Sequence, residues 1–225
     1  MRLEAIQSIP TLLMHMPAST PIARSKTAAL SRVLDSIPKG YHRYIHGTVN
    51  ISKAEALIHK FHQLYGIGCT PAQRITRKAH GKANTLLVVY WPEGAAAIKW
   101  LLLATEGTGL EGENLIDVRN KPRPNWLGYE LVRHPSRDRS SWTWRRPKAE
   151  MAEHYAMLAE LSNKHYASAI EALLQRLANQ PGFYGVRTQT WELSQEARRR
   201  GFEGDLPYIY FVQKVSHGDR FSLDI

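Results

Sequence analysis

Several features that would place the chain in a familiar class are missing from it. Cys69 is the only cysteine among 225 residues, so the chain has neither an intrachain disulfide nor a zinc site built from several thiolates. A cytoplasmic, reducing location is the expectation that follows. No stretch approaches the about 20 apolar residues that a membrane-spanning helix needs, and residues 1–17 lack a convincing signal-peptide cleavage site. We therefore expect no membrane partner.

Motifs of common enzyme classes are also missing. The glycines from Gly107 to Gly112 form neither a GxxxxGK[ST] nor a GxGxxG pattern, and the sequence has no GxSxG elbow. His59 and His62 lie one helical turn apart but lack an obvious third metal ligand. We therefore expect neither a metal nor a cofactor.

Acidic residues are scarce relative to basic ones. Thirty lysines and arginines against twenty acidic residues give a formal charge of +10, which favours a polyanionic partner. The stretch from Arg119 to Arg146 concentrates this charge, because it holds eight basic residues, two acidic residues and three tryptophans. Guanidinium groups pair with phosphates and aromatic rings stack on bases, so this mixture indicates nucleic-acid binding. The alternative is a solvated basic hairpin whose tryptophans fill the core.

The two tryptophans near the end of this stretch illustrate both interpretations. Trp142 and Trp144 share one face of a predicted strand, which Arg146 continues, whereas Arg145 lies on the other face. An open face would make a stacking platform. A covered face would leave only Arg145, Arg133 and the loop arginines, Arg137 and Arg139, to reach phosphate.

Two further basic clusters flank this stretch. Arg74 to Lys82 lies in a connector without an acidic residue, and Arg198 to Arg200 ends a predicted helix that starts near Val186. The second cluster either follows a nucleic-acid groove or stabilises the helix end through the helix dipole. The residues that we expect to contact nucleic acid are Arg74, Arg77, Lys78, Lys82, Arg133, Arg137, Arg139, Trp142, Trp144, Arg145, Arg146, Arg198, Arg199 and Arg200.

Hydrophobic patterning predicts an α+β fold. Alternation predicts a strand over residues 41–49, and a capping box of Ser52 and Glu55 predicts a helix that Gly66 closes. Apolar runs predict strands over residues 85–91 and 97–105, with a helix over 95–104 as the alternative to the second. Shorter strands are predicted over residues 115–118, 127–134 and 142–145. Together these patterns predict an antiparallel, largely meandering sheet of five to six strands with an early packed helix and a helical C-terminal portion.

The chain divides into three predicted regions. Residues 1–40 form a leader, either an arm or a docked helix, with a short helix over residues 26–34. Residues 41–147 form the α+β sheet core. Residues 148–225 form a helical region with a break near Ser162–His165 and a closing strand over residues 207–215. One continuous domain is the alternative if that strand returns to the sheet.

His46 is the candidate catalytic residue. It lies on the early strand before Gly47, and an imidazole can act as general base on an RNA 2′-hydroxyl without a metal. The basic chain, the early strand–helix unit and this histidine loosely resemble the small sheet-based nucleases that cleave CRISPR repeats, whose glycine-rich C-terminal loop has no evident counterpart here. The resemblance implies a metal-independent endoribonuclease.

Three hypotheses follow from the sequence. The first is a nucleic-acid-binding protein, RNA or DNA, within a nucleoprotein complex. The second is the endoribonuclease that uses His46. The third is a basic structural subunit whose tyrosines and tryptophans meet other protein subunits.

Overall fold

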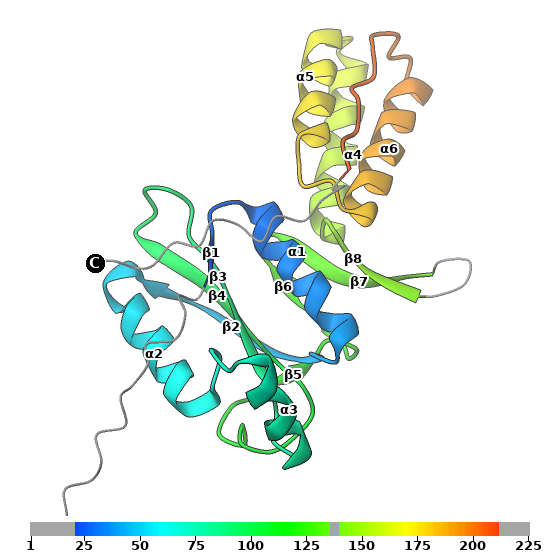
Figure 1. The fold of residues 1–225 in the computed structure, drawn as a ribbon. Helices are drawn as coiled ribbons and strands as arrows, with labels where there is room; N and C mark the ends of the chain where they lie inside the picture. The colour runs from blue at the N-terminus through cyan, green and yellow to red at the C-terminus, as the bar shows by residue number, and fades with distance from the viewer. Residues whose placement is uncertain (1–20, 136–139, 212–225) are drawn as a thin grey trace, which may run out of the picture.

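The fold is α+β, as the sequence predicts, with two sheets and six α-helices among the residues that the structure describes. This computed structural model describes residues 21–135 and 140–211. The large sheet lies between helices, and three C-terminal helices extend from the small sheet (Figure 1). The strands are β1 (Ile22–Ala23), β2 (Arg43–Asn50), β3 (Thr85–Tyr90), β4 (Ala97–Ala104), β5 (Ile116–Asp117), β6 (Asn125–Trp126), β7 (Tyr129–Pro135) and β8 (Ser140–Arg145). The helices are α1 (Lys26–Ser36), α2 (Ala54–Tyr65), α3 (Pro71–Ala79), α4 (Lys148–Asn163), α5 (Ala167–Ala178) and α6 (Tyr184–Arg199), with short 3-10 turns at Ile37–Lys39 and Ile51–Lys53.

The strands divide into two sheets, which differs from the single meandering sheet that the sequence predicts. The large sheet has the order β1-β3-β4-β2-β5, and β1 pairs with β3 in parallel. The small sheet is the antiparallel meander β6-β7-β8. Hydrophobic runs predict strands but do not say which strands pair, because each pairing depends on contacts distant in sequence. The alternative of a helix over residues 95–104 is wrong, since β4 pairs with both β2 and β3.

The large sheet has a hydrophobic core on each face. One core contains α1, the small sheet and the start of α6, and it includes Leu30, Leu103 and Trp144. The other core lies beneath α2 and includes Phe61 and Leu102. The helix predicted over residues 26–34 is confirmed as α1, and its first turn is capped by the Ser25 hydroxyl, which accepts from the Ala28 N–H. Residues 22–37 therefore contribute to the cores of the large sheet.

Two local predictions around α2 and α3 are wrong. Ser52 does not cap α2, because the Asn50 side chain accepts from the Ser52 N–H and starts a 3-10 turn before the helix. Both side chains are good caps, and the earlier one initiates the turn. The predicted connector after Thr70 is instead helix α3, which starts with a capping box formed by Thr70 and Gln73. Gly66 ends α2 in the left-handed conformation, as the sequence predicts.

Helices α4, α5 and α6 pack around their own apolar core, which includes Leu158, Leu174 and Leu193. The break predicted near Ser162–His165 is the boundary between α4 and α5. The closing strand predicted over residues 207–215 is wrong for residues 207–211, which form no strand, and residues 212–215 lie outside the described part of the chain. Residues 206–209 lie along α6 instead. None of the helices in residues 21–135 and 140–211 is long and apolar enough to cross a membrane.

Candidate nucleic-acid interface

The tryptophans predicted to form one stacking platform have different environments. Trp144 is fully buried and donates from its indole nitrogen to the Leu30 carbonyl, 2.9 Å away, so it fixes α1 to β8 and offers no face to a base. Trp142 is half-buried, and the guanidinium carbon of Arg133 lies 5.7 Å from its ring centroid. The prediction that Trp142 and Trp144 form one stacking platform is therefore wrong, and of the two only Trp142 is exposed enough to contact a ligand.

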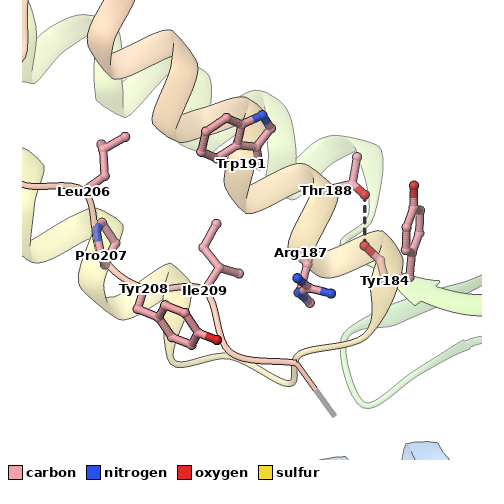
Figure 2. Close-up of a pocket in the computed structure, with 8 residues that line it drawn as sticks. All are labelled: Tyr184, Arg187, Thr188, Trp191, Leu206, Pro207, Tyr208 and Ile209. Carbon is pink, nitrogen blue, oxygen red and sulfur yellow. Dashed lines mark hydrogen bonds between the residues drawn. The ribbon is translucent and has the colours of Figure 1, made fainter. Parts of the chain in front are cut away.

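A groove runs along the first two turns of α6, and we call it the α6 groove. One part has a volume of about 700 Å³ and lies between α6 and residues 206–209. The adjoining part, of about 300 Å³, lies between α6, α1 and β8. Tyr184 and Arg187 line both parts, so the two adjoin at these side chains. Figure 2 shows Trp191 and Thr188 on the α6 wall and Tyr208 on the facing segment.

Aromatic side chains dominate the α6 groove and are open to solvent. Trp191 is 54% exposed, Tyr184 is 52% exposed and Tyr208 is 65% exposed. Monomeric proteins seldom leave such groups exposed together unless a ligand or partner covers them. Sequence reasoning missed this surface, because Trp191 and Tyr208 are separated by a loop and only the packing of residues 206–209 along α6 brings them together.

Arg187 gives the α6 groove its positive charge. Its guanidinium carbon lies 5.1 Å from the Phe211 ring centroid, and its Nε atom is buried without a hydrogen-bond partner among the described residues. No ion pair found in the described part of the chain includes Arg187. Asp35 of α1 lines the narrower part of the groove. A half-buried arginine between aromatic rings can bind an anion and, at the same time, stack on a base.

Arg146 cannot contact nucleic acid, because its side chain is fully buried. The guanidinium donates to the side-chain oxygens of Gln180 and Thr190 and to the carbonyls of Leu177 and Val186, at 2.7–3.1 Å. Burial lowers its pKa from the ordinary arginine value. Arg146 therefore joins the end of β8 to α5 and α6. Its assignment as a nucleic-acid contact is wrong.

The three arginines Arg198–Arg200 at the end of α6 each bond within their own helix or to the residues just after it. Arg199 and Arg200 both bond to the Glu196 carboxylate at 2.6–2.7 Å. The hydrogen bond from Arg199, together with Arg200, lowers the pKa of Glu196 to about 2. Arg198 instead donates to the Phe202 carbonyl, 2.6 Å away, and its guanidinium lies over the Phe202 ring. This geometry favours the interpretation of a stabilised helix end over that of a groove-binding helix.

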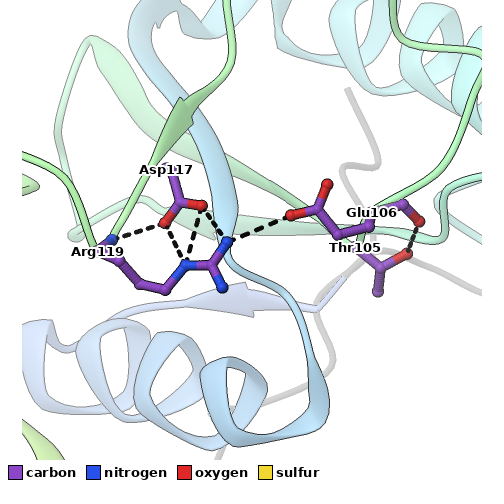
Figure 3. Close-up of polar contacts among 4 residues, drawn as sticks. All are labelled: Thr105, Glu106, Asp117 and Arg119. Carbon is purple, nitrogen blue, oxygen red and sulfur yellow. Dashed lines mark hydrogen bonds and ion pairs between the residues drawn. The ribbon is translucent and has the colours of Figure 1, made fainter.

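Two arginines of the predicted basic stretch also have acidic partners. Arg145 on β8 bonds to the Glu130 carboxylate of β7, 2.9 Å away. Arg119 pairs with Asp117 and, at 3.4 Å, with Glu106 (Figure 3). The hydrogen bond from Arg119 lowers the pKa of Asp117. Asp117 and Glu130 belong to different sheets, and each is paired with an arginine.

The cluster of Arg74, Arg77, Lys78 and Lys82 lies on or just after α3. This helix has no buried residue, and Lys78 and Lys82 are exposed. Arg77 donates to the Ala83 carbonyl, 2.9 Å away, and so attaches α3 to the chain before β3. Arg74 is half-buried, and its Nε atom is buried without a hydrogen-bond partner among the described residues. A basic surface helix that buries nothing contributes little to folding and is available for binding.

The remaining predicted site residues are Arg133, Arg137, Arg139 and His46. Arg133 stands over Trp142, whereas Arg137 and Arg139 lie outside the described residues. His46 is exposed on β2, where its ring stacks against Tyr44 with centroids 6.1 Å apart. Partial desolvation against the sheet lowers the pKa of His46 from its ordinary value, which favours the neutral imidazole.

No group of three or more His, Cys, Asp or Glu side chains in the described residues is arranged to hold a metal ion. Comparison with models of protein families, with curated proteins and with solved structures finds no match for this chain. The function is therefore argued from the geometry of the surface itself.

Proposed function

We propose that this protein binds single-stranded nucleic acid through the α6 groove, as one component of a nucleoprotein complex. The observation that carries the proposal is Arg187, which is half-buried between aromatic side chains and has no acidic partner among the described residues. A phosphate would give this guanidinium the anion that it lacks. Unpaired bases would cover the exposed aromatic rings around it.

The groove suits a flexible strand rather than a duplex. Its walls carry Trp191 and Tyr208 in the wider part and Trp142 in the narrower part. A base stacked on an aromatic ring contributes about 1–3 kcal/mol, which is about a 5- to 150-fold change in affinity. Such stacking needs bases that are free of a duplex. Because every base has an aromatic face, stacking alone predicts weak sequence preference.

The surplus charge outside the groove supports the same function by attracting a polyanion. Lys78 and Lys82 of the α3 cluster are exposed, and residues 70–82 contain no acidic side chain. Such charge raises the rate of association with nucleic acid and makes affinity fall with rising salt. Arg199 and Arg200 contribute less, because they share the Glu196 carboxylate, which offsets one of their two charges.

The test is fluorescence anisotropy with labelled poly-dT and poly-U oligonucleotides of about 15 residues. We expect Trp191→Ala and Tyr208→Ala each to weaken binding about 5- to 150-fold, and Arg187→Gln to reduce the slope of log affinity against log salt by about one. Tyr166→Ala is the matched control, because Tyr166 is exposed to a similar extent and does not line the groove. Equal affinities for the wild-type protein and all three groove variants would refute the groove.

Two observations support the endoribonuclease hypothesis, and the first is the exposed imidazole of His46, whose pKa is lowered by desolvation. A neutral imidazole can remove a proton from an RNA 2′-hydroxyl. Lys99 faces the same side of the sheet, diagonally across the β2–β4 pairing, where a cation would stabilise a developing phosphorane. Incubation of structured RNA with the protein in EDTA tests this function. Cleavage that His46→Ala abolishes would support it, and intact RNA at saturating protein would reject it.

A protein partner is the alternative occupant of the α6 groove, since Leu206, Pro207 and Ile209 add apolar surface to its rim. Tyrosine, tryptophan and arginine are also the residues enriched at protein interfaces. The anisotropy experiment separates the two. A protein that binds no oligonucleotide at 20 mM salt, with its α6 groove intact, would favour the structural-subunit hypothesis.

A further inference from the structure

Arg32 is a basic residue that the sequence reasoning did not single out. It lies on α1, one turn before Ser36, whose hydroxyl bonds back to the Arg32 carbonyl. Its Nε atom is buried and has no hydrogen-bond partner among the described residues. Burial first, and then the positive charge of Arg74, lower the pKa of Arg32. Two arginines from different helices therefore lie close enough to repel each other.

The topology explains how these two helices meet. β1 pairs in parallel with Val89 and Tyr90 at the end of β3, so α1, which follows β1, runs back toward the start of β3. α3 is fixed at that same place, because the Asn84 side chain, immediately before β3, donates to the Arg74 carbonyl at 3.1 Å. Both α1 and α3 therefore approach the start of β3, away from Val89 and Tyr90, where β1 pairs. There Arg32 and Arg74 are near enough for their charges to repel.

The proximity of Arg32 and Arg74 is unfavourable for the folded state unless an anion binds to them. Neither Arg32 nor Arg74 takes part in any ion pair found among the described residues, and the Nε atom of each is shielded from water without a protein acceptor. A buried donor without an acceptor and two nearby like charges both destabilise the folded state. Arg146 shows the contrast, since its buried guanidinium has four protein acceptors.

The geometry points to a phosphate-binding site formed by Arg32 and Arg74 near the start of β3, a second anion site separate from the α6 groove. Each guanidinium presents a planar fork of N–H donors that matches two phosphate oxygens. Lys78 lies one helical turn beyond Arg74 and adds a third positive charge on the same side of α3. Three cations match a phosphate group better than a carboxylate, which has one charge and two oxygens. The phosphate belongs either to a nucleic-acid backbone or to a free phosphate compound.

Both arginines project from elements that are already fixed. The Thr70–Gln73 capping box holds the start of α3, and Arg77 and Asn84 attach the helix on its other side. The α1 helix is held through Leu30 and Val33, which are buried in the core between α1, the large sheet and the small sheet. The site is therefore preorganised, and binding phosphate needs little reordering of the backbone.

The first experiment measures the melting temperature of the full chain in chloride, acetate and inorganic phosphate at equal ionic strength. A site with a dissociation constant of about 1 mM raises the melting temperature in 20 mM phosphate by about 4–7 °C. We expect Arg32→Gln and Arg74→Gln to abolish this rise. In chloride, Arg74→Gln should melt no lower than the wild type, because it removes the repulsion of Arg32. Arg176→Gln is the control, since Arg176 is exposed on α5, away from the site.

The same measurements can overturn the proposal. A wild-type protein whose melting temperature is equal in phosphate and chloride, or rises equally in acetate, has no phosphate site. Either arginine variant that keeps the full rise, or an Arg74→Gln protein that melts well below the wild type in chloride, shows that the pair has a structural role. Arg74→Lys, which keeps the charge but loses the fork, provides a second variant and should retain less than half of the rise.

A second measurement identifies the source of the phosphate and is independent of the α6 groove. If the ligand is a nucleic-acid backbone, Arg32→Gln and Arg74→Gln each lower the slope of log oligonucleotide affinity against log salt by about one. If it is a free phosphate compound, oligonucleotide affinity is unchanged while the phosphate-dependent rise in melting temperature is lost. Both results support the site. Groove variants such as Trp191→Ala should keep the rise in phosphate, so the failure of one proposal would not imply the failure of the other.

Discussion

Replacing Arg146 should damage the stability of the protein and leave its ligand affinity unchanged. The buried guanidinium makes four hydrogen bonds, to Gln180, Leu177, Val186 and Thr190. Hydrogen bonds from a charged group contribute about 1.5–3 kcal/mol each, but burial of the charge offsets part of their sum. Thr190 and the Val186 carbonyl also bond to each other, so they are not left without a partner. We therefore expect Arg146→Met to lower the free energy of unfolding by about 3–4 kcal/mol.

The neighbouring residue is the matched control for this substitution. Arg145 is exposed and pairs only with Glu130 at the surface, so Arg145→Met should cost less than about 1 kcal/mol. Urea denaturation followed by tryptophan fluorescence measures both variants, and anisotropy at a temperature where both are folded measures oligonucleotide binding. If Arg146→Met were as stable as Arg145→Met, or if it alone weakened oligonucleotide binding, the assignment of Arg146 to the joint between β8 and the C-terminal helices would be wrong.

Three further predictions test the same distinctions. Trp144→Ala should lower the free energy of unfolding by about 3–5 kcal/mol, whereas Trp142→Ala should cost less than half as much and weaken oligonucleotide binding in the anisotropy assay. Arg199 holds the folded-state pKa of Glu196 at about 2, below the unfolded value of about 4.3. The stabilisation that the Glu196 carboxylate contributes is therefore complete above about pH 4.3 and is lost as the pH falls toward 2. Glu196→Gln should remove this part of the pH dependence of urea unfolding. Gly185→Ala should lower the free energy of unfolding by about 2 kcal/mol, because the added Cβ would lie 2.6 Å from the Trp144 carbonyl oxygen. This loss should exceed the gain from the higher helix propensity of alanine, and thermal melts of the variant and the wild type would measure it.

The sequence was sufficient to predict most elements of the fold, because their patterns are local. Alternating or continuous apolar residues predict β2, β3 and β4, and apolar stripes predict α4 and α5. It was insufficient for the division into two sheets, since the parallel pairing of Ile22 with Val89 joins residues far apart in the chain. It was also insufficient for α3, which is short and polar: its apolar face has only Ala72, Ile75 and Ala79, and its start is marked by Thr70 and Pro71.

The candidate site was less predictable than the fold for a physical reason. A run of basic residues shows where positive charge lies but not which carboxylates neutralise it. Glu196, three to four residues before Arg199 and Arg200, is a signal in the sequence that could have indicated their pairing, because such residues are neighbours on a helix. The burial of Arg146 had no such signal, since it depends on α5 and α6 packing around the end of β8.

The distribution of paired and unpaired arginines favours binding at positions that charge density alone would not select. Where basic residues are adjacent in sequence, as in Arg145–Arg146 and Arg198–Arg200, they are paired with carboxylates, bonded to carbonyls or buried. Where the fold brings basic residues together from separate elements, as with Arg32 and Arg74, they have no acidic partner among the described residues. Unrelieved repulsion lowers stability, and a binding site is the circumstance in which an anion recovers that loss. We therefore expect ligand binding at the unpaired cations that the fold brings together, rather than in the segments that contain the most cations.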